Sequence, residues 1–286
     1  LWVGLAAVVG TGLSAFGANI LNQWWEVERD RRMVRTRKRP LPAGRVGRRQ
    51  AAIWGVATAL IGLAILALGT NLLTTLLSLF VILVYVLIYT PLKVRTPLNT
   101  VVGAVCGAVP PMMGWTAATG SLDAGAWILG GILFVWQVPH FLALAWMYRE
   151  DYERGGFRML PAVDLEGRIT GRLAFVYAAA LLPITAALSV WGVTGGAFLV
   201  LSQAVGIGFV WLGWAFLRIR NQQTARRLFL ASILYLPAVL GLMVVDMDTT
   251  TPSSQVAVRT AAVAPHNPQA VDSTSKTPAS SIHRGP

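Results

Sequence analysis

Long apolar runs separated by short polar connections dominate the first 248 residues of the chain. Each run is about twenty residues long, which is the length that an α-helix needs to span the hydrocarbon core of a bilayer. The runs cover roughly residues 2–24, 50–69, 72–90, 98–118, 123–147, 171–192, 195–217 and 227–247. The pattern therefore predicts an all-α fold, a polytopic transmembrane helix bundle with eight spans.

Composition and charge agree with a membrane protein. Hydrophobic residues make up 55% of the chain and charged residues only 13%, about half the charged fraction of a soluble domain. Of the 24 Lys and Arg residues, 21 fall in connections on one side of the predicted bundle, and by the positive-inside rule that side is cytoplasmic. The net charge of +12 thus reflects topology and gives no reason to expect nucleic acid as a partner.

The two ends of the chain differ from the predicted bundle. Residues 249–286 are rich in Thr, Ser, Pro and Ala and cannot bury enough apolar surface to offset the entropy of ordering them. We expect a transmembrane domain over residues 1–248 and a disordered tail over residues 249–286. The chain begins with Leu1 inside an apolar run, and eight spans place both ends outside the cytoplasm, so we also expect a lost first helix.

An oxygen-rich run lies where the first apolar segment meets a basic connection. Asn22, Glu26 and Asp30 are four residues apart, so on a helix they fall within an arc of about 80°. Such a row of amide and carboxylate oxygens suits a hard divalent cation such as Mg²⁺, which also binds phosphates. The arginines of residues 31–49 could hold those phosphates, although topology alone also demands positive charge there. The in-line oxygens favour a metal and diphosphate site.

A second polar group follows the fifth apolar run. His140, Met147 and Asp151 lie within about 40° of one another if one helix carries all three, with His140 roughly 16 Å deeper than Asp151. A lone intramembrane histidine can also be only a hydrogen-bonding residue of the bundle, and both interpretations stay open. Tyr148 is either an interfacial aromatic residue or a phenol that donates to a phosphate.

A third group lies between the third and fourth runs. Thr96 and Pro97 are typical of a helix start, which leaves Lys93 and Arg95 beside a helix N-terminus that can bind an anion. Positive charge is required here by topology as well. Together the three groups place acidic ligands, phenols and cations at one membrane face, below an apolar interior. That division fits a substrate with a diphosphate head and a long hydrocarbon tail.

These residues resemble the UbiA superfamily of intramembrane prenyltransferases, and within it the heme-farnesylating branch. Asn22-xxx-Glu26-xxx-Asp30 is similar to the first acidic motif of the superfamily. Three further segments in the same order, residues 35–45, 89–99 and 136–161, are similar to segments of the branch, and the likeness extends over about residues 10–245. Two positions depart from the superfamily pattern, because Glu26 stands where Asp is usual and Asp151 is followed four residues later by Gly155 instead of Asp.

The resemblance implies a ring of nine transmembrane helices around a central cavity that opens to the cytoplasm. It implies transfer of the farnesyl group of farnesyl diphosphate to a vinyl group of heme b, with addition of water, to give heme O for terminal oxidases. Mg²⁺ is the implied cofactor. The implied partners are the lipid bilayer and, downstream, heme A synthase or oxidase assembly proteins. The implied location is the inner (plasma) membrane of a prokaryotic cell.

Site roles follow from the same resemblance. We expect Asn22, Glu26 and Asp30 to bind the metal and Asp30, Asp151 and His140 to act in catalysis. The diphosphate is expected to contact Arg35, Arg39, Lys93, Arg95 and Tyr148. A prenyltransferase that acts on a quinone precursor or a chlorophyllide is the nearest alternative. A transporter is an alternative from another class, but transporters gather their polar residues near the bilayer midplane.

Overall fold

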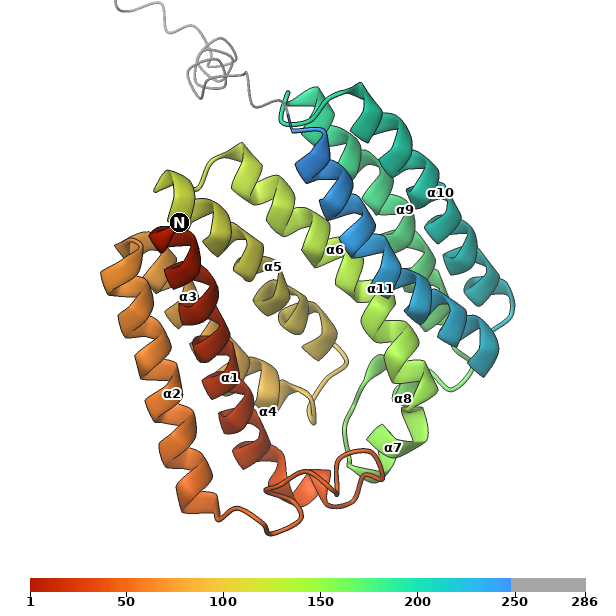
Figure 1. Cartoon of the computed structure of the whole chain (residues 1–286). Coiled ribbons are helices and arrows are strands. Elements are labelled where there is room, and N and C mark those ends of the chain that lie inside the picture. The colour runs from red at the N-terminus through yellow and green to blue at the C-terminus, as the bar shows by residue number, and fades with distance from the viewer. Residues whose placement is uncertain (248–286) are drawn as a thin grey trace, which may run out of the picture. The chain divides into compact units, whose positions relative to one another are not determined.

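The computed structural model of the chain describes residues 1–247 and consists of helices and connections, with no strand among those residues (Figure 1). Eight helical segments are long and apolar enough to cross a membrane, which confirms the predicted polytopic fold. The expected tail, residues 249–286, lies outside the described residues. The spans are α1 (Trp2–Asp30), α2 (Arg48–Gly69), a composite span (Leu72–Leu92), α5 (Asn99–Thr119), α6 (Ala124–Met147), α9 (Arg168–Val190), α10 (Gly196–Arg218) and α11 (Gln222–Val245).

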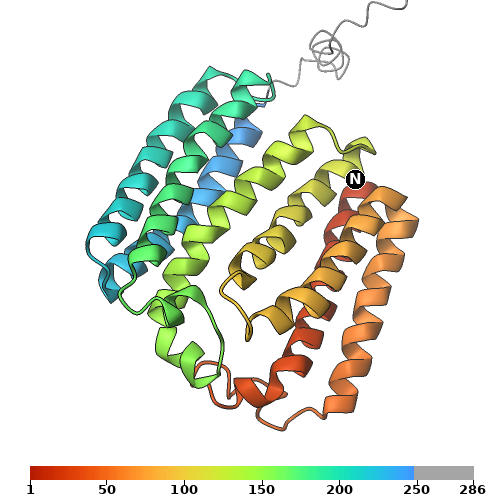
Figure 2. The ribbon, with the colours of Figure 1, turned by 180° about the vertical axis from the view of Figure 1, so that it is seen from behind.

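The polar connections with most of the basic residues lie at one end of the bundle, which we call the charged end. It comprises residues 31–47, 93–98, 148–167 and 219–221, and it carries the short helices α7 (Arg149–Arg154) and α8 (Leu160–Val163). Figures 1 and 2, seen from opposite sides, show the connection after α1 and the region of α7 at the lower end of the ribbon.

Helix α1 is longer than the apolar pattern predicts. It continues through the polar residues to Asp30, so the row of oxygen side chains belongs to the C-terminal part of a continuous helix. Glycines bring α1 and α2 into close contact: a Cβ atom at Gly17 would lie 2.5 Å from the backbone nitrogen of Ala59. Small residues of this kind allow membrane helices to pack backbone to backbone. The close α1–α2 pair forms one wall of the bundle.

The third span is not a regular α-helix. It begins as α3 (Leu72–Leu83), widens into the π-helix η1 (Val84–Tyr89) and ends as the short α4 (Thr90–Leu92). Thr90 Oγ1 donates a hydrogen bond to the carbonyl oxygen of Tyr85 at 2.8 Å and so supports the wider turn. Single π-turns of this kind are frequent at functional sites.

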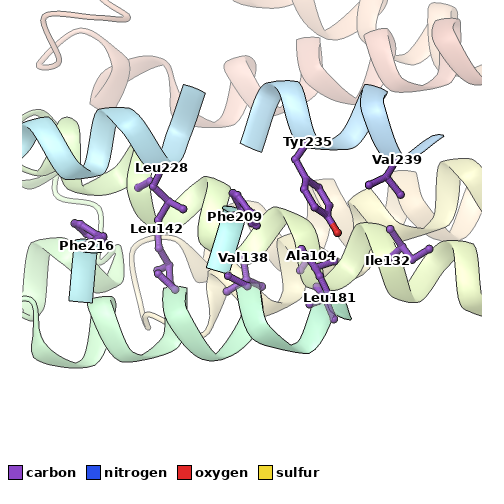
Figure 3. Packing of buried hydrophobic residues seen from close by; sticks show 14 of the residues in the cluster. Ala104, Ile132, Val138, Leu142, Leu181, Phe209, Phe216, Leu228, Tyr235 and Val239 are labelled. Carbon is purple, nitrogen blue, oxygen red and sulfur yellow. The ribbon is translucent and has the colours of Figure 1, made fainter. Parts of the chain in front are cut away.

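Helix α6 is the most buried span, and it connects the two halves of the bundle. It packs against α5 on one side and against α9 and α11 on the other (Figures 1 and 2). The largest apolar cluster forms around it, as Figure 3 shows for Leu142 of α6, Leu181 of α9, Phe216 of α10 and Leu228 of α11. This cluster fixes the end of α6 that leads into the charged end.

Candidate active site

A cavity of about 220 Å³ opens at the charged end, between α1, η1 and the connections that follow α1 and α7. The three predicted metal ligands, Asn22, Glu26 and Asp30, all line it. Its other lining residues are Asn19, Gln23, Met33, Arg35, Thr36, Arg39, Tyr85, Tyr89, Lys93, Tyr152, Phe157 and Met159. The helical spacing in the sequence thus gathers the oxygen side chains at one place.

Glu26 and Lys93 form a buried ion pair in this cavity. Glu26 is 4% exposed, and Lys93 Nζ lies 3.0 Å from its Oε1 and 3.1 Å from its Oε2. Lys93 donates a hydrogen bond with good geometry only to Oε2. The buried Oε1 therefore has no hydrogen-bond donor and can still accept one or bind a cation. Lys93 also lies 4.6 Å from the ring centre of Tyr89, whose π-face stabilises the cation.

Asp30 forms the second pair. It is 2% exposed, and Arg39 Nη1 lies 2.9 Å from its Oδ2. The hydroxyl of Thr36 donates to the backbone carbonyl of Asp30 at 2.9 Å, which folds the chain after α1 back over the helix end. The fold brings Arg39 from the basic connection onto the acidic row.

Asn22 completes the row. Its Nδ2 donates to Thr90 Oγ1 at 2.9 Å, so its carbonyl oxygen is the group left for a cation. The described residues contain no group of three His, Cys, Asp or Glu side chains that could hold a metal alone. Two carboxylates and an amide, with the unused acceptor on Glu26, suit Mg²⁺, which takes one or two carboxylates and completes its shell with water and substrate phosphates.

Asp151 holds the connection after α1 and does not line this cavity. Its two oxygens accept hydrogen bonds from the backbone N–H groups of Val34, at 2.7 Å, and Arg35, at 3.0 Å. It also pairs with Arg154 at 3.2 Å. The predicted stripe shared with His140 requires one helix from His140 to Asp151, but α6 ends at Met147 and α7 begins a new helix. Asp151 thus fixes the position of Arg35.

Arg35 forms the boundary of the cavity. Its Nη2 donates to the hydroxyl of Tyr152 at 3.1 Å, and its guanidinium carbon lies 5.2 Å from the ring centre of Tyr148. Of the expected diphosphate ligands, Arg35, Arg39 and Lys93 line the cavity with the acidic row. Tyr148 instead lines a neighbouring cavity, and Arg95 is exposed and lines neither of the two.

His140 lies apart from the acidic row, on the side of α6 that faces α11. Its Nδ1 is 2.8 Å from Ser232 Oγ, and its ring stacks on Trp136 with ring centres 5.0 Å apart. Ser232 Oγ donates to the carbonyl oxygen of Phe229, so the hydroxyl accepts from a protonated Nδ1. His140 does not line the cavity that contains Glu26 and Asp30.

Comparison with known proteins decides the family. Residues 1–236 match the UbiA prenyltransferase family. The chain belongs to this family. It is 43% identical over 242 residues to the protein named protoheme IX farnesyltransferase from Solibacter usitatus, covering 85% of this chain and 83% of that protein. It is 46% identical to the mitochondrial protoheme IX farnesyltransferase of Homo sapiens, covering 84% of this chain and 54% of the human protein.

Solved structures of UbiA homologues share the fold. A UbiA homologue from Aeropyrum pernix K1 superposes with a TM-score of 0.65 at 23% identity, covering 85% of this chain and 87% of that one. A UbiA homologue from Archaeoglobus fulgidus, bound to GPP and Mg²⁺, superposes with a TM-score of 0.58 at 13% identity, covering 85% and 88%. The chain is therefore a UbiA-type prenyltransferase in sequence and in fold.

Some residues that line the cavity of this UbiA prenyltransferase are not predicted from the sequence. Tyr85 donates from its hydroxyl to Asn19 Oδ1 at 3.1 Å, and Phe157 lies 5.9 Å from Lys93 Nζ. The four-residue spacing of Tyr85 and Tyr89 indicates that the two rings share one helix face. The direction in which that face points depends on the π-turn, which the spacing does not predict. Phe157 lies in a connection without hydrophobic periodicity, so no sequence pattern predicts its position in the cavity.

Proposed function

We propose that this UbiA prenyltransferase transfers the farnesyl group of farnesyl diphosphate to a vinyl group of heme b, with addition of water, to give heme O. The protoheme IX farnesyltransferase relatives support the acceptor and the donor. The observation that carries the proposal is the cavity in which three buried oxygen side chains meet Arg35, Arg39 and Lys93. An anionic head binds at the cations, and an apolar tail fits among the helices above them.

The roles of the chain's residues follow from the geometry. Asn22, Glu26 and Asp30 would hold Mg²⁺, which supplies positive charge that stabilises the departing diphosphate. Arg39 and Lys93 neutralise Asp30 and Glu26 and lie within reach of a phosphate at the same rim. Arg35 closes the cavity from the other side, and Tyr89 and Phe157 keep the region around Lys93 apolar. Fixed cations in a cavity with little water stabilise developing negative charge strongly.

The proposed reaction proceeds in two stages, transfer of the farnesyl group and addition of water. The bond between C1 of the farnesyl chain and the diphosphate oxygen breaks, and the oxygen keeps the electron pair. The terminal carbon of the heme vinyl group forms a bond to C1 with its π electrons. Water then adds its oxygen to the other vinyl carbon and loses a proton. We place the reaction at the cytoplasmic face of a prokaryotic inner membrane, with heme A synthase or oxidase assembly proteins as users of the product.

Diphosphate release provides one test of the acceptor. Membranes that contain the full-length protein are supplied with farnesyl diphosphate and Mg²⁺, and then with heme b or with a phenolic quinone precursor. We expect release of diphosphate only when heme b is present. Release with the phenol and none with heme b would overturn the proposal.

Asp151→Ala should weaken binding of farnesyl diphosphate. The change leaves the N–H groups of Val34 and Arg35 without their acceptor, so the guanidinium of Arg35 loses its fixed position. We expect the KM for farnesyl diphosphate to rise about tenfold with a smaller change in kcat, because the lost contact binds the substrate before reaction. Glu153→Ala, which removes an exposed carboxylate of the same short helix that lines neither this cavity nor the neighbouring one, is the control. Equal KM values for the two variants would remove the positioning role of Asp151.

His140→Ala tests the catalytic role that the resemblance suggests for this histidine, which we place in the addition of water. If the imidazole takes the proton that water loses, kcat for the heme product should fall at least about tenfold, with the KM for farnesyl diphosphate unchanged. Ser232→Ala is the matched control, because it removes the partner of Nδ1 and keeps the imidazole. We expect it to have the smaller effect. Unchanged rate and product in His140→Ala would reduce His140 to a packing residue.

A further inference from the structure

A second and larger cavity, of about 770 Å³, lies at the charged end beside the first. Its walls come from the end of α6, from α7, from the turn at residues 34–35 and from the connection between α10 and α11. The volume is in the range of cofactor and ligand sites, at roughly 300–1,000 Å³. None of the residues proposed to bind the metal lines it.

The walls of the second cavity carry four arginines. They are Arg35, Arg149, Arg154 and Arg220, against two acidic residues, Glu150 and Asp151. Both oxygens of Asp151 are already used by backbone N–H groups and by Arg154. Within residues 1–247, Arg149 and Arg220 form no salt bridge, although Arg220 Nη1 donates to the carbonyl oxygen of Leu217 at 2.7 Å. The cavity thus presents guanidinium groups that are available to an anionic ligand.

Aromatic side chains line the same cavity. Tyr148 is 39% exposed, and the buried Trp146 lies behind Arg149, whose guanidinium carbon is 4.6 Å from the Trp146 ring centre, which holds that arginine at the wall. Arg35 lines both cavities, so a ligand in the second cavity lies next to the proposed diphosphate site. A planar ligand with carboxylates at one edge matches this combination of aromatic side chains and bidentate cations.

We propose that the second cavity binds the two propionate carboxylates of heme b, mainly through Arg149 and Arg220. This inference rests on the proposed function, because it assigns the acceptor of that reaction to a place. The propionates and the vinyl groups lie on opposite edges of the macrocycle. Propionates held at Arg149 and Arg220 therefore leave the vinyl edge to point past Arg35 toward the farnesyl diphosphate in the first cavity.

The experiment compares heme b with heme b dimethyl ester, whose propionates carry no charge. Both are titrated by absorption spectroscopy into the purified full-length protein in zwitterionic nanodiscs. Arg149→Gln/Arg220→Gln should raise the Kd for heme b about a hundredfold, since each of the two charged hydrogen bonds lost is worth about tenfold. The Kd for the dimethyl ester should be the same in the double variant and the unchanged protein.

Arg172→Gln/Arg218→Gln is the matched control. These two arginines are at the same end of the bundle and outside the second cavity, and Arg218 lies over a tryptophan ring as Arg149 does, 5.7 Å from that of Trp214. We expect no change in the Kd for heme b. The KM for farnesyl diphosphate should also stay unchanged in Arg149→Gln/Arg220→Gln.

The outcomes separate this inference from the proposed function. If the unchanged protein binds no heme, the proposed function itself fails. If it binds heme b and Arg149→Gln/Arg220→Gln binds it equally well, only the propionate site is contradicted. Anionic lipid headgroups offer the same negative charge, so the titrations are repeated with anionic nanodiscs. A double variant that loses only its preference for anionic lipid, with heme b binding intact, would also overturn the inference.

Discussion

Asp30→Ala should lower kcat/KM for farnesyl diphosphate by about a thousandfold while the protein remains folded and inserted. Asp30 is the most buried of the three proposed metal ligands, and its Oδ2 also holds Arg39 at the rim. Its loss removes a metal ligand and also the carboxylate that holds Arg39 in place. Removal of one preorganised electrostatic group lowers the rate by about 10²–10³. Turnover of heme b by the purified variant is the measurement.

The fold should tolerate Asp30→Ala because its partner is not deeply buried. The Arg39 side chain is 37% exposed and can return to water, so its lost pairing costs little stability. Glu28→Ala is the matched control, since Glu28 is an exposed carboxylate near the end of the same helix that pairs with Arg31. We expect the control to keep its activity. Wild-type turnover in Asp30→Ala would remove the metal role from this residue.

Lys93→Met should have a large effect on stability as well as on activity. Lys93 is the cation that neutralises Glu26; the Glu26 side chain is buried at 5% exposure, and that of Lys93 is largely buried at 13%. Removing one partner of a buried ion pair leaves an uncompensated charge, which costs about 3–5 kcal/mol. The same change removes a cation from the proposed diphosphate site, so turnover should fall as well. Thermal unfolding in detergent and the KM for farnesyl diphosphate measure the two effects.

The double variant Glu26→Gln/Lys93→Met separates the two effects. Replacing Glu26 removes the unpaired charge, so we expect most of the lost stability to return. Turnover should stay low, because the double variant lacks a metal ligand and a diphosphate cation. A double variant that regains activity together with stability would show that the pair is structural only. A single Lys93→Met variant as stable as the unchanged protein would contradict the buried ion pair.

The acidic row could be predicted from sequence because it depends on a single helix. Asn22, Glu26 and Asp30 share a face by their spacing, and α1 continues through all three. The eight spans were predictable for a similar reason, since the length and polarity of each run report directly on the thickness of the bilayer. Local periodicity was sufficient for both.

Other parts of the site depend on contacts that no spacing records. Asp151 binds backbone N–H groups about 117 positions earlier in the chain, and the break between α6 and α7 turns it away from the stripe it would share with His140. Thr90 meets Asn22 because of the π-turn, which sequence periodicity does not predict. The pairing of the acidic row with Lys93 and Arg39 likewise requires the folded connections at the charged end.

The two cavities also separate residues that the sequence placed in one site. Tyr148 was expected to contact the diphosphate, but it lines the larger cavity with Arg149. Arg95, expected in the same role, is exposed and lines neither cavity. The helical break at Tyr148 explains the first difference, because it sets α7 on a new axis. The basic residues of the charged end therefore lie in three places: the first cavity, the second cavity and the exposed surface.

The central claim is that this chain joins a farnesyl chain to heme b with the addition of water. The most direct measurement supplies isotopically labelled farnesyl diphosphate, Mg²⁺, heme b and a phenolic quinone precursor together, in ¹⁸O water, and identifies the products by mass spectrometry. We predict that the label appears on heme that carries one farnesyl group and one ¹⁸O hydroxyl. Label on the phenol with heme b unchanged would contradict the account.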